Sequence, residues 1–541
     1  MGAPLWPCVQ LTVTYRGRVT RRGLLLPNAR SQTGRRVAAA GAALLVGLPG
    51  LVAAAPVNAA PRPIGAHSED FPPALASYYT QSLAWESCAD GLQCAWLTVP
   101  LDYADPSGAT IQIRVNKAAA RGPVSQRQGA IVINPGGPGG SGLDFTQYTA
   151  RYVAPKVNAD FDIVGFDPRG VGKSAPITCV TGRQTTALLE TTSTPSTAAE
   201  RQHVMDMAKI VGQGCQKMSP TLARHVGTEN TIRDMDILRA ALGEQKLNWI
   251  GWSYGTYLGT LYLEAFPDRV GRFVLDGALD PSNDSMQMSR GQSRGFQVAI
   301  TRFAADCAKR ATCAFKGGTA KVISGINALL ARLDTKPMPT SDPRRKLTQA
   351  DALSALFYSM YSPVFWPSLR IGLKQATRDD GTGLQTLADI SSKRTGPNTY
   401  EGNETSAFYA ISCWDSPAPP GSAGLAAAAA RWSRSAPVPA MAQSMAWGNA
   451  PCTTWYGHSS QPPAPASSTT TAPIVVVGTL YDPATPYPWA VALSKQLPTS
   501  TLLTYKGDGH TAYGSGSGCI NKALETYLLT GAVPAAGLVC T

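Results

Sequence analysis

The chain has 541 residues, 44% of them hydrophobic and 15% charged, a composition that excludes intrinsic disorder and allows one large domain with an insertion or two to four ordinary domains. Its formal net charge is +13, but seven of the 48 basic residues and none of the 35 acidic ones lie within residues 1–59, so the remainder carries only +6. This mild charge, without a cluster of basic and aromatic residues, argues against a nucleic-acid-binding protein.

Residues 1–59 are predicted to be a leader that directs export. The pair Arg35-Arg36 precedes an apolar run and the small-residue pattern at residues 57–59, which is the order found in a cleavable signal peptide. An uncut membrane anchor over residues 37–55 is the alternative. The paired arginines also suit the twin-arginine route, although alanines stand where a hydrophobic pair should follow. We expect a secreted or cell-envelope-associated protein with no membrane span after cleavage.

The cysteines agree with export. Ten of the 11 follow the leader and show no Cys-x-x-Cys spacing of the kind that binds metals, so an even set in an exported protein predicts five disulfides. The spacing alone does not fix their connectivity. Pairing between neighbours would give Cys88–Cys94, Cys179–Cys215, Cys307–Cys313, Cys413–Cys452 and Cys519–Cys540.

The first half of the mature chain alternates strands and helices. Strand-like apolar runs, each leading into a turn, occur at residues 130–134, within 161–174, at 247–251 and at 272–276. A helix with Thr228 as its N-cap and Gly243 just beyond its end precedes the third run, and another helix follows that run. Strands separated by helices predict a mostly parallel sheet with right-handed crossovers, and therefore an α/β fold.

This alternation stops and later resumes. Residues 282–460 have mostly helical character, and a strand pattern returns at residues 474–478 after a linker rich in Pro, Ser and Thr. We therefore expect an α/β core in two parts, residues 60–281 and 461–541, with a helical cap inserted between them at 282–460.

The stretch GWSYGT at residues 251–256 contains the candidate nucleophile, Ser253. The pattern Gly-x-Ser-x-Gly occurs by chance in ordinary strand-to-helix turns, but in hydrolases it puts the serine at the tip of a strained turn. Because a serine hydroxyl is protonated at neutral pH, it needs a nearby base, a group that orients the base, and donors for the oxyanion that forms.

His510 and Asp482 are the candidate base and acid. His510 lies in the glycine-rich stretch KGDGHTAYGSG, and the other histidines suit ordinary structural positions better. Asp482 follows a strongly apolar strand, although taken alone it would fit a turn or a helix N-cap equally well. The order Ser253, Asp482, His510 is that of α/β-hydrolases and differs from the chymotrypsin and subtilisin orders. Asp508, two residues before the histidine, is poorly placed to orient its ring.

The glycine-rich stretch NPGGPGGSG offers backbone N–H groups for an oxyanion hole. We expect Gly137 to donate one of them and Tyr254, directly after the candidate nucleophile, to donate the other. Such a loop could instead cradle phosphate, but it lacks the lysine and the spacing of a P-loop.

These motifs together resemble a known family, the secreted tripeptidyl aminopeptidases of actinomycetes, which are serine exopeptidases related to the prolyl iminopeptidases. The resemblance extends over nearly the whole mature chain and is carried, in order, by NPGGPGGSG, FDIVGFDPRGVGKS, GWSYGTYLG, DGALDP, YDPATP and GHTAYG. It implies an α/β-hydrolase core with a helical cap, and release of short peptides, typically tripeptides, from a free N-terminus. It also implies Ser253 as nucleophile, Asp482 as acid and His510 as base. Pro135 stands where the loop of prolyl iminopeptidases begins with histidine.

An aminopeptidase must also bind the substrate ammonium group, which calls for a fixed acid in the cap. The stretch EGNETSAFYAISCWDSP offers Glu404 and Asp415, which a helix would place on one face but roughly 16 Å apart along its axis. We prefer Glu404, because the family's cap carries an Asn-Glu pair in this region, although solvated acids at the ends of a helix explain both residues equally well. Thr485 could steady Asp482, line the pocket or merely cap the next helix.

Two further functions stay open at this point. The same three residues would serve an esterase or acyltransferase acting on lipid or antibiotic esters, and a cell-envelope binding protein with a vestigial site is a third possibility. The peptidase interpretation requires peptide substrates with a free N-terminus, and no metal or organic cofactor. The sequence does not determine the oligomeric state.

Overall fold

The computed structural model describes residues 71–459 and 461–541. The predicted leader, residues 1–59, lies outside the described residues, so the signal peptide and its export route stay predictions. No helix in the described ranges is long and apolar enough to cross a membrane.

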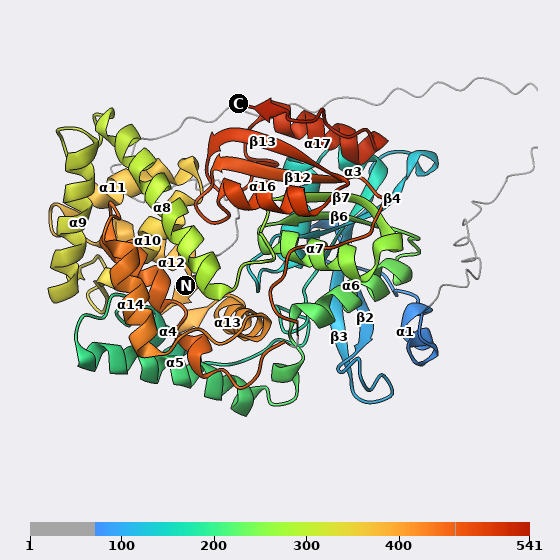
Figure 1. Cartoon of the computed structure of the whole chain (residues 1–541), viewed down its shortest axis with the longest axis horizontal. Helices are drawn as coiled ribbons and strands as arrows, with labels where there is room; N and C mark the ends of the chain where they lie inside the picture. Colours follow the sequence, from blue (N-terminus) through green and yellow to red (C-terminus); the bar gives the residue numbers. More distant parts are fainter. Residues whose placement is uncertain (1–70, 460) are drawn as a thin grey trace, which may run out of the picture. The chain divides into compact units, whose positions relative to one another are not determined.

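The described part of the chain is built around a central sheet (Figure 1). Ten of the described strands form this sheet, in the order β1-β2-β3-β5-β4-β6-β7-β12-β13-β14. The strands from β5 to β14 run parallel, and β1, β2 and β3 add an antiparallel edge. This confirms the predicted α/β fold. The strands are β1 (Glu86–Ser87), β2 (Gln93–Pro100), β3 (Thr110–Ala118), β4 (Gly129–Asn134), β5 (Phe161–Phe166), β6 (Leu247–Trp252), β7 (Val270–Asp276), β12 (Ile474–Tyr481), β13 (Ser500–Asp508) and β14 (Val539–Cys540).

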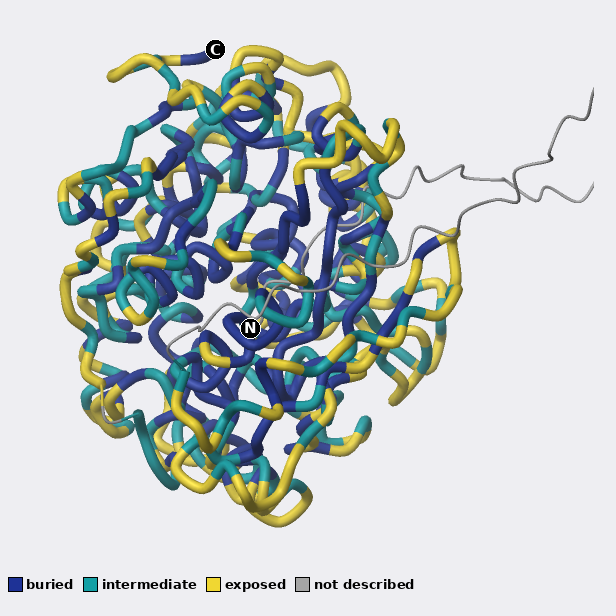
Figure 2. The backbone as a smooth tube through the Cα atoms, turned by 90° about the vertical axis from the view of Figure 1, so that its right-hand side faces the viewer, coloured by how far each residue is buried: buried dark blue, intermediate teal, exposed yellow. Residues whose placement is uncertain are grey.

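Both faces of the parallel strands are buried, which explains their continuous apolar runs. In β12, Val475 and Val477 pack into one core while Ile474 and Val476 pack into the other. This alternation follows from the two-residue period of a strand. Figure 2 shows that buried backbone, in dark blue, fills the interior of the described part of the chain, while exposed segments lie at its periphery.

Helices cover the two faces of the sheet. One core contains side chains of α6 (Thr228–Ala241), α7 (Tyr254–Ala265) and α16 (Tyr487–Gln496). The other contains side chains of α3 (Val157–Asp160) and α17 (Gly518–Thr530). A short helix, α2 (Gly142–Tyr148), follows the glycine-rich loop, and α1 (Ala76–Tyr79) lies near the first residues described.

The predicted helix before β6 begins one residue earlier than expected. Its N-cap is Gly227, and Thr228 is the first helical residue, so the prediction of Thr228 as N-cap was wrong. The predicted C-terminal signal is confirmed, because Gly243 follows the helix with φ 77°, a conformation that favours glycine. The side chain of Thr228 is thereby free of a capping role, and it turns toward the candidate site.

The segment between β7 and β12 is mostly helical, as predicted, and has a hydrophobic core of its own. It lies to the left of the sheet in Figure 1. Two short hairpins interrupt it, β8 (Met338–Pro339) with β9 (Lys346–Leu347) and β10 (Arg394–Gly396) with β11 (Thr399–Tyr400). Its helices are α8 (Ser285–Ala308), α9 (Thr319–Thr335), α10 (Gln349–Met360), α11 (Trp366–Ala376), α12 (Thr382–Ser391), α13 (Glu404–Asp415), α14 (Ser422–Ser433) and α15 (Pro439–Trp447), followed by the 3₁₀ turn η8 (Ala450–Thr454).

Two helices from the first half of the chain join this helical region. The helix α5 (Ala198–Met218) contacts α13, α14 and η8, and α4 (Gly182–Glu190) contacts α10. Both lie within residues 60–281, the range predicted for the first part of the α/β core. Periodicity could not place them, because an amphipathic helix packs equally well on a sheet or on other helices.

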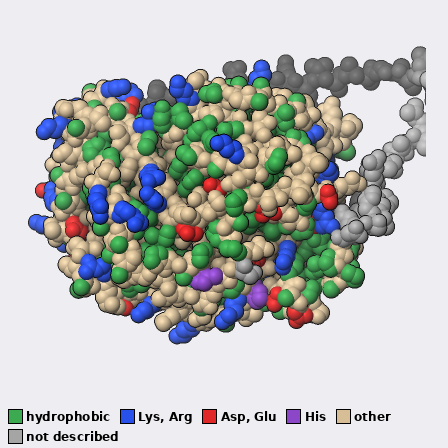
Figure 3. Space-filling model, viewed as in Figure 1, with side chains coloured by type: hydrophobic (Ala, Val, Ile, Leu, Met, Phe, Trp, Pro, Cys, Tyr) green, Lys and Arg blue, Asp and Glu red, His purple; other side chains and the backbone are tan. Residues whose placement is uncertain are grey.

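All five disulfides predicted by neighbour pairing are confirmed. They are Cys88–Cys94, Cys179–Cys215, Cys307–Cys313, Cys413–Cys452 and Cys519–Cys540. On the face drawn in Figure 3, Lys and Arg side chains are scattered and do not merge into a single basic stripe.

Candidate active site

Ser253 lies on a sharp turn between β6 and α7. Its backbone has φ 54° and ψ −120°, a region that non-glycine residues rarely occupy, and its N–H donates to the carbonyl of Asp276 at 2.9 Å. Such backbone strain concentrates at functional sites. The GWSYGT stretch therefore forms a strained elbow and not an ordinary loop.

The flanking glycines are required by close packing. A Cβ atom on Gly255 would lie 2.6 Å from the carbonyl oxygen of Asn134, and one on Gly251 would overlap the carbonyl of Gly255. The helix after Ser253 therefore starts directly against β4 and β6. The Gly-x-Ser-x-Gly pattern is here a consequence of how tightly the elbow sits on the sheet.

Asp482 and His510, which are 28 residues apart in sequence, meet at the carboxyl ends of β12 and β13. Nδ1 of His510 lies 2.9 Å and 3.0 Å from the two carboxylate oxygens of Asp482. Both side chains are buried. Asp482 also accepts the backbone N–H groups of Ala484, Thr485 and Thr511, at 2.9 Å, 2.8 Å and 3.1 Å. The carboxylate is thus fixed in place and faces the imidazole.

Thr485 belongs to the same cluster. Its hydroxyl donates to Asp482 at 3.0 Å and lies 3.2 Å from Nδ1 of His510. The N-cap of α16 is Pro486, so Thr485 does not cap the following helix. These distances fit the predicted role in which Thr485 steadies Asp482.

The helical region holds the His510 loop from the other side. The backbone N–H of His510 donates to the carbonyl of Tyr361 at 2.8 Å, and the Tyr361 ring packs edge-on against the imidazole, with ring centres 5.3 Å apart. Asp508 forms an ion pair with Arg302 of α8, and the Arg302 guanidinium lies 3.6 Å from the centre of the Tyr481 ring. Asp508 is therefore turned away from the imidazole, as its position in sequence predicted.

The glycine-rich loop passes directly over the elbow. A Cβ atom on Gly136 would lie 2.6 Å from the carbonyl of Trp252 and 2.9 Å from Cβ of Ser253, so only glycine fits there. Gly137 and Tyr254 line one pocket together with Ser253. Neither of their backbone N–H groups donates to another residue in the described part of the chain. Two unused donors therefore border the space beside the serine.

This pocket, with a volume of about 170 Å³, lies between the sheet edge and the helical region. Apolar walls come from Leu279, Met288, Phe408 and Met445. Among the described residues that line it, the charged ones are two acids, Asp280 and Asp415, and none is basic. The pocket therefore favours a positively charged ligand group over a negatively charged one.

Asp415, the last residue of α13, is bound to the start of α6. Its carboxylate accepts the backbone N–H of Thr228 at 2.9 Å and also the Thr228 hydroxyl, which in turn contacts the hydroxyl of Tyr254. Burial raises the pKa of Asp415 to about 7, and the two Thr228 hydrogen bonds only partly oppose that rise. A carboxyl group with this pKa in a ligand pocket is a candidate functional group.

Glu404, at the opposite end of α13, is placed differently. Its carboxylate forms an ion pair with Lys393 at 2.6 Å, and it lines two other cavities, neither of which includes Ser253. Burial raises the pKa of Glu404, and the charge of Lys393 opposes that rise. The structure therefore brings Asp415, and not Glu404, into the pocket of the candidate nucleophile.

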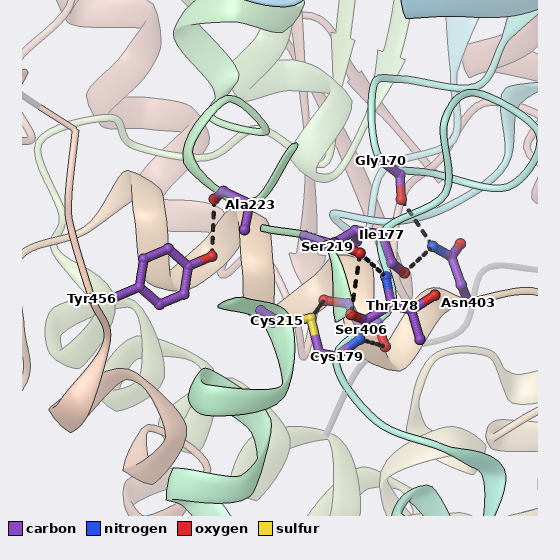
Figure 4. Close-up of a disulfide and its surroundings, with 10 residues drawn as sticks. All are labelled: Gly170, Ile177, Thr178, Cys179, Cys215, Ser219, Ala223, Asn403, Ser406 and Tyr456. Atoms are coloured by element: carbon purple, nitrogen blue, oxygen red, sulfur yellow. Dashed lines mark hydrogen bonds between the residues drawn. A yellow bond between two sulfur atoms is a disulfide. The ribbon is translucent and has the colours of Figure 1, made fainter. Parts of the chain in front are cut away.

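The Asn-Glu pair that favoured Glu404 has another use here. The Asn403 side chain donates to the carbonyls of Gly170 and Ile177 at 2.9 Å and 2.8 Å (Figure 4). It also accepts the N–H of Gly172 at 2.9 Å. Ser406 accepts the N–H of Cys179 at 3.0 Å, next to the Cys179–Cys215 disulfide. These contacts attach the start of α13 to the loop after β5.

Asp280 is a site residue that the sequence analysis missed. One of its carboxylate oxygens accepts hydrogen bonds from the N–H and hydroxyl of Ser282 and from Gln496, at 3.1 Å, 2.6 Å and 3.0 Å. The signal was available, because the stretch DGALDP begins with the last residue of β7 and continues into the loop at the edge where Ser253 lies. An acid in the loop that follows a parallel strand lies near the ligand-binding edge of the sheet.

The arrangement supplies the parts that acyl transfer requires: a hydroxyl on a strained turn, an imidazole bound to a carboxylate, and backbone donors beside the hydroxyl. In the described ranges no group of three or more His, Cys, Asp or Glu residues is placed to hold a metal ion.

The fold and this site define a serine hydrolase of the α/β-hydrolase class. Residues 129–320 match the family model described as alpha/beta hydrolase fold, and residues 436–540 match the model described as TAP-like protein. The chain is 34% identical over 469 residues to a tripeptidyl aminopeptidase of Streptomyces lividans, covering 84% of this chain and 86% of that protein. The chain belongs to the tripeptidyl aminopeptidase family of α/β-hydrolases.

Two mycobacterial relatives extend the comparison. Serine protease Hip1 of Mycobacterium tuberculosis is 35% identical over 481 residues, which is 85% of this chain and 91% of the relative. A protein of the same organism named carboxylesterase B is 37% identical over 513 residues, covering 92% and 96% of the two chains. The relatives therefore include both peptidase and esterase names.

Proposed function

We propose that the protein is a secreted serine aminopeptidase that releases short peptides, most often tripeptides, from free N-termini. The observation that carries the proposal is the pocket of Ser253, which contains Asp415, a buried carboxylate with no basic residue beside it. A substrate ammonium group is the partner that this carboxylate lacks. The peptidase names of two relatives support the same substrate class.

In the proposed reaction, Ser253 Oγ attacks the carbonyl carbon of the scissile peptide bond. His510 takes the hydroxyl proton on Nε2, since Nδ1 faces Asp482. The oxyanion of the tetrahedral intermediate then receives hydrogen bonds from the N–H groups of Gly137 and Tyr254. When the C–N bond breaks, the departing amine takes the proton from His510 and the acyl group stays on Ser253.

A water molecule completes the cycle. His510 removes a proton from the water as it attacks the acyl carbonyl, and returns that proton to Ser253 Oγ when the ester bond breaks. Asp482 holds the imidazole in one tautomer and stabilises the imidazolium. The Thr485 hydroxyl, in contact with both groups, restricts their relative orientation. None of these steps needs a metal ion or an organic cofactor.

Restriction to free N-termini follows from the position of the acids. An ammonium group bound by Asp415 fixes one end of the peptide, and the carbonyl that reaches Ser253 is then set by the length of chain between them. Blocking the amine removes the charge that the carboxylate binds, and the carboxylate is then left buried and unpaired. Asp280 is the second acid of the pocket and the natural comparison for Asp415.

An esterase is the alternative, favoured by the relative named carboxylesterase B. Ester hydrolysis would use the same three residues, but it would not need a carboxylate in the acyl pocket. Secretion is the remaining part of the proposal. It rests on the predicted leader and on the five disulfides, which are typical of proteins in oxidising compartments.

The proposal is tested with three chromogenic substrates, one tripeptidyl, one single-prolyl and one short acyl ester, and with each peptide N-terminally free or blocked. We expect the free tripeptide to be preferred and blocking to lower its kcat/KM about 100-fold. Cleavage that survives blocking contradicts the aminopeptidase assignment, and preference for the ester favours the esterase.

The triad is tested in parallel with S253A. We expect a loss in kcat of about 10⁵-fold or more, no labelling by a fluorophosphonate probe, and an unchanged melting temperature. A folded S253A protein that keeps its activity overturns the mechanism for every substrate class.

A further inference from the structure

Asp276 is a buried acid that the proposed mechanism leaves unused. It is the last residue of β7, the strand between β6, which leads to Ser253, and β12, which leads to Asp482. Its side chain is fully buried. It therefore lies at the carboxyl edge of the sheet between the strands that carry the nucleophile and the acid.

The backbone and side chain of Asp276 bind different parts of the site. Its carbonyl accepts the N–H of Ser253 at 2.9 Å. Its carboxylate accepts the N–H of Ala512 at 3.0 Å and that of Tyr513 at 2.7 Å, two and three residues after His510. A single residue thus connects the nucleophile elbow to the histidine loop.

The imidazole also packs close to this position. A Cβ atom on Gly277 would lie 3.3 Å from Cε1 of His510. The ring of Trp252, just before Ser253, stacks on the ring of Tyr513 with centres 6.2 Å apart. The elbow, the end of β7 and the histidine loop therefore form one packed unit in which Asp276 is the charged member.

Asp276 carries its charge without a basic side chain as partner. Burial raises its pKa to about 6, the Ala512 and Tyr513 N–H groups oppose the rise, and His510 and Asp482 act on it through their charges. Two other groups near the imidazole are Tyr361, which packs against the ring, and Asp508, which is paired with Arg302. Two acidic side chains, Asp482 by direct contact and Asp276 through its charge, therefore act on one imidazole.

We propose that Asp276 is a positioning residue of the hydrolase: it holds the Ser253 elbow and the His510 loop in register and adds a second negative charge that stabilises the imidazolium. The inference rests on the proposed triad. A purely structural role would consist only of the hydrogen bonds to residues 512 and 513, without any effect on the protonation of the catalytic base. The two roles therefore differ in the pH dependence of the rate.

The variant D276N keeps the size of the side chain and one accepting oxygen but removes the charge. We expect kcat to fall about 10- to 100-fold, because small displacements of catalytic groups have effects of this size, with KM changed less than about 2-fold. The acid limb of the kcat/KM profile should move to lower pH, because the imidazolium loses a stabilising charge.

D162N is the matched control. Asp162 is also a buried acid that accepts a backbone N–H, that of Ala120 at 2.8 Å, but it lies at the amino end of β5, away from the edge that carries the site. We expect D162N to lower the melting temperature and to leave the pH profile unchanged. D276N with the wild-type pH profile, and with no larger loss of kcat than D162N, overturns the inference.

D276E decides the question if D276N does not fold. It keeps the charge but displaces the carboxylate, so kcat should fall while the acid limb stays near that of the wild type; a wild-type kcat contradicts the positioning role. S253A, assayed alongside, separates this inference from the proposed function. If S253A is active, the triad is wrong; if S253A is dead and both Asp276 variants behave as wild type, only the role of Asp276 is wrong.

Discussion

The two ends of α13 each carry an acid, and the structure surrounds them differently. At the N-terminal end, Glu404 is paired with Lys393, and the neighbouring Asn403 binds the loop after β5. At the C-terminal end, Asp415 has only hydroxyl and backbone donors from Thr228 and lines the pocket of Ser253. One helix therefore joins an attachment point to the core with a wall of the candidate active site.

This difference shows that a carboxylate's capacity to bind a substrate amine depends more on whether a basic side chain already binds it than on the sequence motif around it. The negative charge of Glu404 is already compensated by a lysine, so a substrate amine would have to displace that lysine to bind. The negative charge of Asp415 has no such partner, and burial raises the pKa of this carboxyl to about 7. Of the two acids, Asp415 is therefore the one that gains more from binding a cation.

Among changes at the two ends of α13, the largest effect is expected from D415N. Removing one partner of a buried charge pair should lower kcat/KM for a free tripeptidyl substrate about 100-fold, while an acyl ester that carries no amine should change less than about 3-fold. D280N is the matched control from the same pocket, and its loss should be smaller. Equal losses for the ester and the amine substrate would show that Asp415 acts only by supporting α6.

A stability measurement checks the folding of D415N. Because the pKa of Asp415 is raised in the folded state, the folded protein holds this proton more tightly than the unfolded chain, so ionisation between about pH 4 and pH 7 lowers the stability of the wild type. The asparagine variant lacks this loss. The difference in melting temperature, D415N minus wild type, should therefore be more positive at pH 8 than at pH 4.

The next effect is the pH dependence of amine recognition. Below pH 7 the carboxyl of Asp415 becomes protonated and no longer attracts an ammonium group, so kcat/KM for the free tripeptide should fall more steeply than for the ester, by up to about 10-fold per pH unit. The ratio of the two kcat/KM values isolates this group. A ratio that stays constant from pH 5 to pH 8 in the wild type would exclude Asp415 as the amine-binding acid.

At the other end of the helix, N403A should affect stability and not recognition. It removes three hydrogen bonds to the loop after β5, which should lower the free energy of unfolding by about 2–3 kcal/mol. Denaturant unfolding measures this loss. We expect kcat/KM to stay within about 3-fold, and a selective loss of activity on free-amine substrates would place the recognition site at the wrong end of α13.

The smallest effect is expected from E404Q. Its amide can still accept a hydrogen bond from Lys393, so kcat/KM for free and blocked substrates should change less than about 2-fold. Steady-state assays of both substrates, beside D415N, check this. A 100-fold loss confined to the free amine would reverse the comparison and restore Glu404 as the recognition acid.

Much of the site could be predicted because its signals are local. Gly251, Ser253 and Gly255 lie within five residues, and their spacing reflects the tight turn itself. Each disulfide joins two consecutive cysteines of the chain, so the simplest pairing was also the observed one. Asp482 and His510 each follow an apolar strand, and parallel strands bring their carboxyl ends to one edge of a sheet.

The recognition end of the site could not be predicted in the same way. Preference for Glu404 rested on the Asn-Glu pair, but Asn403 contacts Gly170, Gly172 and Ile177, more than 220 residues away in sequence. Whether a carboxylate has a basic partner depends on which side chains the fold brings to it, as the turn between α12 and β10 brings Lys393 to Glu404. Asp280 was different, since its place in the loop after β7 was a signal in the sequence, and the structure shows that this loop lines the pocket.

The sequence by itself determined the alternation of strands and helices, the strained serine turn and the order of the three candidate catalytic residues, because each depends on backbone period, local spacing or order along the chain. It predicted five disulfides, and the structure decided their pairing. Only the tertiary structure decided which end of α13 faces Ser253, which acid lacks a cation, and that Asp276 joins the serine elbow to the histidine loop. These depend on how folded segments pack against one another, where burial and the nearest charge determine what a carboxylate can bind.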